Sequence, residues 1–552
     1  MKTPKLLCSL FAAFLAATAF ADIKINSSVK NGDKLTGVVE IRVTVVSDSP
    51  INQVEFYVND ELRSTDTSTP YTFTIDTVLE KEGPLTLEIA AFAANGESKR
   101  LKLNLLVDNE VGKGAKYHTD NAIKFLQASK FDEAIRACRI ALKADENYVP
   151  AKITMARAFL GKGILDEAEK WAEDAYLSEE SVDTAELLSG IHVERAFRTI
   201  SISGEKGDAL KTIATSLKNA VIYKRKANEL RLKALGKLTD ENRLAIVDLY
   251  IANNEYSAAR RLLREKWNDI KPDNAIGNRL VFVEMRSGRM KEAWDVLKAI
   301  ETRGTPDEVT YALLAAGYAY YRNYDKASEA IRNAILAGTE SPIVTTAAAY
   351  LAVRKGDLNA ISSQINDMLR KNITDPEVYF YLSVLQYYNG NYAESRENFK
   401  KTVMQNPLLF DAYIQRGYEA LASALAKGVD PKDKEILLEQ ARVYMEVALE
   451  AKPDAAEALN GLAIMNMFLN KNEEALRYAE AATRAGGQYP WTWFTYSAAL
   501  DLNKRSVEAQ KAVDKAGELD FVVLKGRAIP SKEEAWIYTF RNGRIPTLIA
   551  PK

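Results

Sequence analysis

Cysteine and histidine are almost missing from this chain of 552 residues, which holds two of each. A catalytic triad or a metal site built on histidine needs more of these residues than His118 and His192 supply. Cys138 shares helical spacing with Ala134 and Ala141, so we interpret it as a small core residue rather than a nucleophile. Phosphate-binding loops, nucleophile elbows and zinc-protease motifs are also missing. Acidic residues are abundant, but no pair stands out, and we predict no enzyme and no catalytic, cofactor or metal site.

An excess of either charge is also lacking, since 74 Lys and Arg residues face 75 Asp and Glu residues, a formal net charge of -1. Such a chain has no general attraction for nucleic acid or an anionic bilayer. The most basic stretch, 206–237, mixes Lys and Arg with apolar residues at helical spacing. We interpret it as the solvated face of amphipathic helices, with an anion-binding or lipid-facing patch as the alternative. No nucleic-acid partner is predicted.

The first 21 residues differ in kind from the rest. Lys2 and Lys5 precede the apolar run 6–20, and the segment ends in Ala19-Phe20-Ala21. This pattern is typical of a secretory signal peptide, and the run is short for the alternative, a membrane anchor. No later stretch is apolar enough to span a membrane, and cleavage would remove Cys8, one of the two cysteines. We therefore predict an exported protein, periplasmic or extracellular, with no internal disulfide and no transmembrane span in the mature chain.

From residue 22 to 108, apolar residues alternate with polar ones at a period of two, as in Val54-Glu-Phe-Tyr-Val-Asn-Asp60. Turn-prone pairs such as Asn95-Gly96 separate these runs at the spacing of an antiparallel sandwich. The run at Val54, followed by Pro70-Tyr71, resembles the bacterial Ig-like modules that accompany many exported enzymes and surface proteins. The resemblance implies a small β-sandwich without catalytic residues.

Residues 109–115 are a predicted linker, and beyond them the period becomes helical. From 116 to 519 a pattern returns about every 34 residues, with two helix-sized amphipathic stretches around an aromatic, two residues and an alanine. Phe131-Asp-Glu-Ala134 and Tyr324-Asp-Lys-Ala327 are two copies. Helices packed 8–10 Å apart leave no space for a branched side chain at the crossing, which explains the alanine. Since each pair can bury its apolar face only against neighbouring pairs, a solenoid is predicted.

The repeats resemble the tetratricopeptide repeat. In one copy the pattern positions are occupied by Tyr379, Leu382, Ser383, Gly390, Tyr392, Ser395, Phe399 and Pro407. The resemblance implies a mainly α protein, a right-handed solenoid of about ten helical hairpins behind the sandwich, with a concave groove lined by the first helix of each pair. Two stretches, 193–240 and 425–437, lengthen the repeat. After 519 the repeat signal is lost, and 520–552 is predicted to cap the last apolar face or to dock elsewhere.

Carried onto this sequence, the resemblance places nine side chains toward a partner. They are Phe380, Val384, Tyr387, Tyr388, Asn460, Met467, Phe468, Trp491 and Phe494. Packing between repeats is an equal interpretation for Tyr387 and Phe468. We predict an exported, non-enzymatic interaction scaffold that binds a protein or peptide in its groove, in a setting such as envelope assembly or secretion. The alternative is a carbohydrate-binding or carbohydrate-active envelope protein that stacks a glycan on the aromatic cluster at 489–496.

Overall fold

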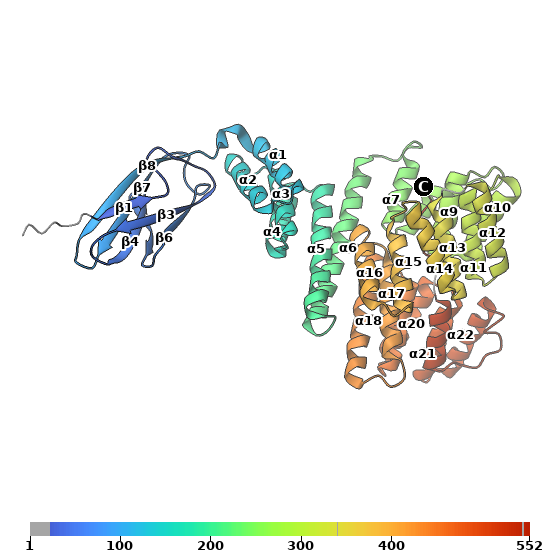
Figure 1. Ribbon diagram of the computed structural model, residues 1–552. Coiled ribbons are helices and arrows are strands. Elements are labelled where there is room, and N and C mark those ends of the chain that lie inside the picture. The colour runs from blue at the N-terminus through green and yellow to red at the C-terminus, as the bar shows by residue number, and fades with distance from the viewer. Residues whose placement is uncertain (1–22, 339–340, 544–545, 552) are drawn as a thin grey trace, which may run out of the picture. The chain divides into compact units, whose positions relative to one another are not determined.

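The computed structural model describes residues 23–338, 341–543 and 546–551. The predicted signal peptide and Cys8 lie outside these ranges. The chain divides into two compact units, of which the first ends at Ile164 and the second begins at Leu165. Strands and three helices make up unit 1, and helices make up unit 2 (Figure 1). None of the helices in the described ranges is long and apolar enough to cross a bilayer.

Unit 1 begins with two β-sheets (Figure 1). The strands are β1 (Lys24–Ser27), β2 (Lys34–Leu35), β3 (Val38–Val46), β4 (Ile51–Val58), β5 (Glu61–Asp66), β6 (Tyr71–Asp76), β7 (Gly83–Ala93) and β8 (Ser98–Val107). One sheet has the order β1-β3-β6 and the other the order β2-β8-β7-β4-β5. The short β2 runs parallel to β8, whereas the other pairs are antiparallel. The predicted Ig-like sandwich is confirmed.

The sandwich core follows from the alternation in the sequence. Val54, Phe56 and Val58 of β4 are buried, and the rings of Phe56 and Phe73 stack with their centroids 5.2 Å apart, joining the two sheets. Residues with period two point to alternate faces of a strand, so one face of each strand fills the space between the sheets. Asn59 and Asp60 both have positive φ in the tight turn from β4 to β5.

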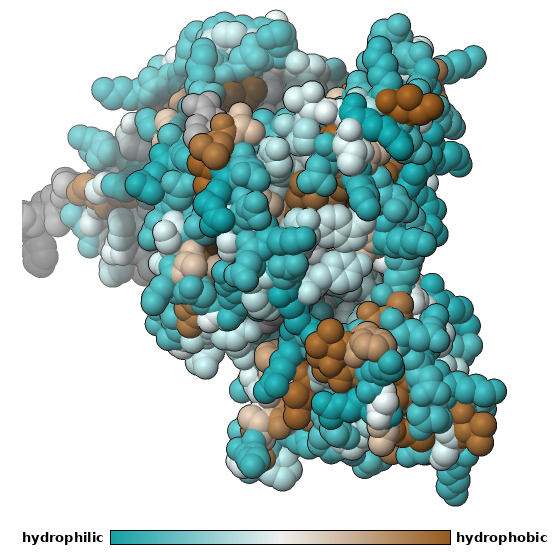
Figure 2. All heavy atoms as spheres, turned by 90° about the vertical axis from the view of Figure 1, so that its right-hand side faces the viewer, coloured by the Kyte–Doolittle hydropathy of each residue, from teal (hydrophilic) through white to brown (hydrophobic). Residues whose placement is uncertain are grey.

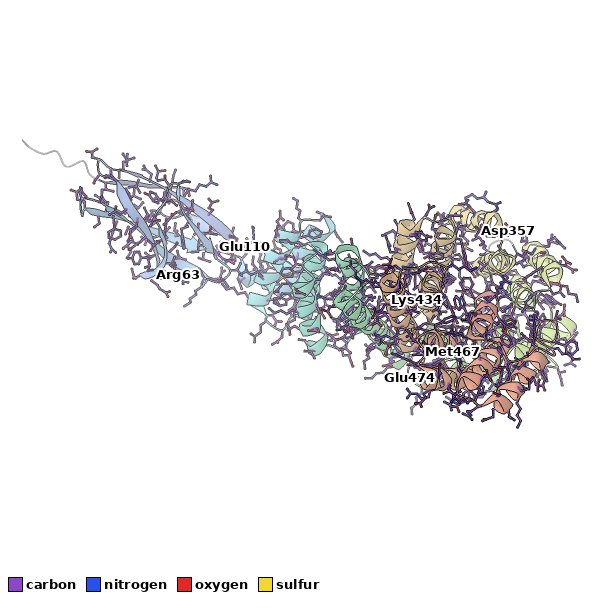
Figure 3. All side chains as sticks on the ribbon, turned by 90° about the horizontal axis from the view of Figure 1, so that it is seen from below. Arg63, Glu110, Asp357, Lys434, Met467 and Glu474 are labelled. Carbon is purple, nitrogen blue, oxygen red and sulfur yellow. The ribbon has the colours of Figure 1, made fainter. Side chains whose placement is uncertain are left out.

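Three helices complete unit 1: α1 (Gly114–Gln127), α2 (Phe131–Ala144) and α3 (Val149–Gly161). The segment predicted as a linker contains the short 3-10 helix η1 (Val111–Lys113), and Glu110 lies where the sandwich meets the helices (Figure 3). Asn109 is buried and donates from Nδ2 to the carbonyl of Thr77 at 3.1 Å. Arg139 of α2 forms an ion pair with Asp76 at 2.6 Å, so the sandwich and the first helices pack together.

From α5 to α22, unit 2 consists of helical hairpins, each an odd-numbered helix followed by an even-numbered one; α4 precedes them and α23 follows them. Its helices are α4 (Leu165–Ser178), α5 (Val182–Ser203), α6 (Asp208–Ala234), α7 (Arg243–Ala252), α8 (Tyr256–Arg264), α9 (Asn274–Arg286), α10 (Met290–Arg303), α11 (Glu308–Tyr320), α12 (Tyr324–Ala337), α13 (Pro342–Lys355), α14 (Leu358–Arg370), α15 (Pro376–Tyr388), α16 (Tyr392–Gln405), α17 (Phe410–Ala424), α18 (Pro431–Ala451), α19 (Ala456–Phe468), α20 (Asn472–Ala485), α21 (Pro490–Leu502), α22 (Ser506–Leu519) and α23 (Lys532–Asn542).

The repeat is visible in the backbone. Asn254, Gly288, Arg322, Gly356 and Gly390 all have positive φ at the turn inside a hairpin, and each follows the one before by 34 residues. A residue in this conformation ends a helix sharply and lets the second helix fold back on the first. The alanines of the aromatic-x-x-alanine pattern are fully buried, as a close helix crossing requires; they are Ala134, Ala168, Ala327 and Ala475. The predicted helical solenoid is confirmed.

Helices far apart in the sequence lie side by side in unit 2. The two stretches that lengthen the repeat form α6 and α18, and these helices pack against each other (Figure 1). Lys218 of α6 pairs with Glu446 of α18 at 3.0 Å, and Arg225 donates to the carbonyl of Glu450 at 2.6 Å. Within the same basic stretch, Lys224 pairs with Glu186 at 2.6 Å. Much of the predicted solvated basic face is therefore in ion pairs that hold the helices together.

Candidate binding groove

The C-terminal helix α23 packs against the first helices of three hairpins. The rings of Trp536 and Tyr418 on α17 stack with their centroids 6.0 Å apart. Asn460 of α19 donates from Nδ2 to Thr539 Oγ1 at 3.1 Å. A capping box of Ser531 and Glu534 fixes the start of α23. The helix thus covers apolar side chains of α17, α19 and α21, so it docks on three hairpins and is not confined to the last one.

Beyond α23 an extended segment, residues 546–551, continues over α9, α13, α15 and α17. We call it the C-terminal strap. Thr547, Leu548 and Ile549 are only 5%, 4% and 7% exposed. The strap is neither a helix nor a strand. Its burial therefore depends on contacts with the side chains of these helices. The stretch of wall between α9 and α17, which the sequence analysis took to be open to a partner, is therefore occupied by the chain itself.

Side chains of the helices bind the strap largely through its main chain. Arg286 of α9 donates to the carbonyl of Pro546 at 3.0 Å, and Tyr381 of α15 donates to the carbonyl of Thr547 at 2.6 Å. The amide of Ile549 donates to Thr346 Oγ1 on α13 at 3.3 Å. These three bonds use main-chain groups. Every residue of a peptide has the carbonyl, and every residue except proline has the amide.

A buried ion pair lies beneath the strap. Arg286 donates through both terminal nitrogens to Asp411 at 2.9 and 2.6 Å, and its guanidinium lies 4.5 Å above the ring of Phe410. Burial lowers the pKa of Arg286, but the charges and hydrogen bonds of Asp411 and Tyr256 together outweigh it, and the pKa stands well above its usual value. Thr547 donates its hydroxyl to Asp411 at 3.1 Å. The pair thus presents one donor and one acceptor to the strap.

The strap does not fill the groove. A cavity of about 320 Å³ remains beside residues 547–551, between them and side chains of α7, α9 and α17. A smaller space of about 50 Å³ lies beside Thr547 and is lined by Phe380, Val384 and Glu457. Close-packed protein interiors contain few voids larger than a water molecule. The strap is therefore seated in a groove with room beside it.

Glu457 is an unusual acid in this groove. Its side chain is 4% exposed, and Oε1 has no hydrogen-bond partner in the part of the chain that the structure describes. Burial raises the pKa of Glu457 to about 7, against a usual 4.5. The groove thus contains a carboxyl group that titrates near neutrality.

Of the nine predicted groove residues, five contact or adjoin the C-terminal part of the chain. Phe380 and Val384 adjoin Thr547, and Asn460 bonds to α23. Phe494 packs against Tyr538 with ring centroids 5.2 Å apart, and the ammonium of Lys532 lies 5.1 Å from the ring centre of Phe468. The structure thus brings these five to one wall, where the contacts made are with the protein's own residues.

The other four predicted residues lie elsewhere or inside the packing. Tyr387 is half-buried, its hydroxyl donates to the carbonyl of Glu419 at 3.3 Å, and Tyr388 beside it is exposed. Met467 is fully buried among the helices of unit 2 (Figure 3). Trp491 is 1% exposed and stacks on Tyr489 with the ring centroids 4.8 Å apart, so this indole has no open face for a sugar ring.

Exposed aromatic side chains are found near Trp491 instead. Weakly polar and hydrophobic residues surround a hollow on the face of unit 2 that Figure 2 shows. A pocket of about 690 Å³ is lined by the rings of Tyr320, Tyr321, Phe521 and Tyr538 as well as Trp491. Tyr321 and Phe521 are the two exposed members of this set.

Sequence reasoning missed the residues that bind the strap: Arg286, Asp411, Tyr381 and Thr346. The signal was present for the first two, because each is a charged residue inside an apolar helical stretch, Leu280–Arg286 and Leu408–Tyr413. A buried charge needs a partner of opposite charge. Each of the two residues therefore indicated that such a partner exists, but not where it lies in the sequence.

Chemical groups outside the groove behave as packing residues. Cys138 is fully buried, and burial raises the pKa of its thiol to about 12, which confirms its interpretation as a core residue. His118 and His192 are buried as well, the latter stacked on Tyr223 with ring centroids 5.6 Å apart. Over the described ranges, no cluster of three or more His, Cys, Asp or Glu side chains is placed to hold a metal ion.

Comparison with known proteins identifies both kinds of domain. Residues 24–89 match the bacterial Ig domain family, and residues 119–182 match the tetratricopeptide repeat family. The curated proteins contain no match to this chain. Fibronectin(III)-like modules of Clostridium thermocellum CbhA are 30% identical, covering 15% of this chain and 94% of theirs, with a TM-score of 0.14.

Two helical repeat structures are similar over longer stretches. A thermophilic tetratricopeptide-repeat protein of Thermus thermophilus is 19% identical, covering 36% of this chain and 97% of its own, with a TM-score of 0.30. Yeast Tom70 is 14% identical, covering 78% of this chain and 95% of its own, with a TM-score of 0.33. Residues 24–89 thus match a bacterial Ig domain and residues 119–182 a tetratricopeptide repeat, in a chain whose fold is a β-sandwich followed by helical hairpins.

Proposed function

We propose that this protein is an exported, non-enzymatic interaction scaffold that holds a partner protein through an extended peptide segment in the groove of unit 2. The observation that carries the proposal is the strap itself. Helices α9, α13 and α15 bind an extended segment through its main-chain carbonyls and an amide, while apolar side chains around them accept its side chains. Main-chain contacts give affinity to such a site, and the side-chain pockets give it specificity.

The surroundings of the strap support a groove of moderate specificity. The wall offers aromatic rings from Phe380, Phe410 and Tyr418 and the buried ion pair of Arg286 and Asp411. Rigid aromatic side chains provide large contact areas at a low cost in conformational entropy. These properties suit the binding of a protein segment better than the conversion of a small substrate.

The export part of the proposal depends on residues 1–21 and is tested separately. Full-length chain produced in a bacterial host is fractionated, and the amino terminus of the recovered protein is sequenced. A mature chain that begins at Asp22 in the periplasm or medium supports export, and a chain that keeps Met1 in the cytoplasm contradicts it. Envelope assembly or secretion is the proposed setting.

Partner binding in the groove is tested by photo-crosslinking in the source cell. A benzoylphenylalanine replaces Val353, a half-buried residue that lines the groove beside Phe380. The matched control places the same group at Ile335, an exposed residue of α12. A protein that is crosslinked from position 353 but not from position 335 supports a partner in the groove. Identical crosslinked sets at both positions contradict it.

A further inference from the structure

The chemistry of the groove and its present occupant define a partner more closely; this inference rests on the proposed function. We infer that the strap is an intramolecular stand-in for the partner. The partner then carries an extended segment with an apolar residue, a serine or threonine, and two further apolar residues, and it binds by displacing residues 546–551.

The hydroxyl position is the most selective. Asp411 already accepts two bonds from Arg286 and accepts a third from the Thr547 hydroxyl at 3.1 Å. A side chain there must donate and be short, which threonine and serine satisfy. Aspartate or glutamate would place a second carboxylate against Asp411 without a donor between them. Valine would fill the space but leave the Asp411 oxygen one bond short.

The flanking positions require apolar side chains. Leu548 and Ile549 are buried in the core of unit 2, and the space beside them is lined by Ile251, Phe282 and Leu409. Burying an apolar side chain is favourable in proportion to the area removed from water, and a carboxylate here would face Asp248, Asp375 and Glu377, which line the same space. The main-chain bonds from Arg286 and Tyr381 add affinity that is independent of sequence.

The strap can leave without unfolding the hairpins. Its main-chain bonds go to side chains rather than to a sheet or helix, and about 320 Å³ of space already lies beside it. Helix α23, by contrast, is held by its capping box and by ring contacts to α17 and α21. Release of residues 546–551 therefore exposes the wall between α9 and α17 while α23 remains in place.

The covalent connection to α23 makes the strap a strong competitor. A tethered ligand acts at an effective concentration on the order of millimolar for short connections. A free segment of equal intrinsic affinity therefore binds the intact chain more weakly than it binds a chain that lacks the strap. The difference between these two affinities measures the occupancy of the groove by the strap.

The test uses a labelled synthetic peptide, Pro-Thr-Leu-Ile-Ala-Pro-Lys, which is the sequence of residues 546–552. Its binding to the full chain and to a chain ending at Asn542 is followed by fluorescence anisotropy. We expect saturable binding to the shortened chain, at least about tenfold weaker binding to the full chain, and at least about threefold weaker binding when valine replaces threonine in the peptide. Equal weak binding of the peptide and a scrambled version would overturn the inference.

A matched pair of variants locates the binding in the groove. In the shortened chain, Tyr381→Phe removes the donor to the Thr547 carbonyl, and we expect several-fold weaker peptide binding. Tyr324→Phe also removes a hydroxyl that donates to a backbone carbonyl, at Arg354, and Tyr324 lines neither space beside the strap. This control should leave the peptide affinity unchanged. Equal effects of both variants contradict a site at Tyr381.

A second variant covers the case in which the shortened chain does not fold. The full-length Leu548→Asp/Ile549→Asp variant keeps α23 and opposes burial of the strap. We expect it to keep the wild-type helical circular dichroism signal and to bind the peptide as tightly as a chain without the strap. If the chain ending at Asn542 and the Leu548→Asp/Ile549→Asp variant both lose their helical signal, the strap is part of the core and the inference is wrong. Peptide binding without any crosslinked partner at position 353 would show that the strap can be displaced, but it would reject the proposed function and with it the role of the strap as a stand-in.

Discussion

At the scale of single residues, the groove depends on a pair of charges that the fold removes from water. Arg286 and Asp411 are both buried and joined by two hydrogen bonds. Burying a charge is costly, and this cost is offset only while the partner and the remaining hydrogen bonds are in place. The pair is thus a place where a small change in the sequence has a large effect.

Arg286→Met removes one partner of this pair and leaves the Asp411 carboxylate buried. We expect the free energy of unfolding of unit 2 to fall by about 3–5 kcal/mol. Adding Asp411→Asn should make the combined loss smaller than the sum of the two single losses, since the uncompensated charge is gone. Urea unfolding of wild type, the two single variants and the double variant measures these losses in the free energy of unfolding. Arg477→Met, at an exposed arginine, is the control with an expected change below about 0.5 kcal/mol. Strictly additive losses would contradict the pairing.

Glu457 predicts a dependence of stability on pH. Its pKa is about 7 in the folded chain against a usual 4.5, so the folded state holds this proton more tightly. The stabilisation is complete below pH 4.5 and is lost as the pH rises through 7, to an extent of at most about 3 kcal/mol. Glu457→Gln should therefore raise the urea midpoint relative to wild type more at pH 8 than at pH 5. The exposed Glu518→Gln is the control, and parallel pH profiles of Glu457→Gln and wild type would contradict the assignment.

At the scale of elements, two lengthened helices close the superhelix of unit 2. The turn between α5 and α6 reaches α17 and α18, where Glu205 accepts a hydrogen bond from Tyr444 and lies 3.6 Å from Arg416. Its carbonyl accepts from Gln440 at 2.7 Å. The contact joins residues more than 200 positions apart and keeps the hairpin of α5 and α6 against the hairpin of α17 and α18.

Glu205→Ala tests this closure. It removes the acceptor of Tyr444 and the carboxylate nearest Arg416, and we expect a loss of about 1–3 kcal/mol in the free energy of unfolding. Amide hydrogen exchange should become faster in α5, α6 and α18, with α11 to α14 unaffected. Glu229→Ala removes an exposed carboxylate of α6 that lies 3.9 Å from Lys226, and it should change neither quantity appreciably. Uniformly faster exchange along unit 2 would contradict a local role.

The strands and helices were predictable from the sequence. The contacts between helices that are far apart in the sequence were not. Alternation around Val54 identified the sandwich, and the spacing from Phe131 to Ala134 and from Tyr324 to Ala327 identified the hairpins, because these patterns reflect contacts within one or two neighbouring elements. The contact of α6 with α18 depends on small rotations summed over many hairpins, which no local pattern encodes. The two lengthened stretches were visible in the sequence, but their mutual contact was not.

The same limit applies to the groove. The repeat register determines the face of each first helix, and the predicted residues Phe380, Val384 and Asn460 lie beside the C-terminal part of the chain. Arg286 and Asp411 are 125 residues apart, and only the closed superhelix brings them together. The strap was unpredictable for a further reason, since it has no period and its place depends on the wall that receives it.

At the scale of the whole molecule, the scaffold proposal depends on where the C-terminal segment lies. A seated strap makes unit 2 a groove that already holds an extended segment, which the proposed partner would displace. The most direct test places benzoylphenylalanine at Ala550, which borders the cavity of about 320 Å³ and so leaves room for the added ring.

Irradiation of the purified chain at low concentration should yield intramolecular crosslinks from position 550 to α7, α9 or residues 406–411, which line this cavity. Addition of excess peptide with the sequence of residues 546–552 should reduce their yield, since the peptide competes for the same wall. Crosslinks only between different molecules, or to none of these segments, would contradict a strap seated in the groove.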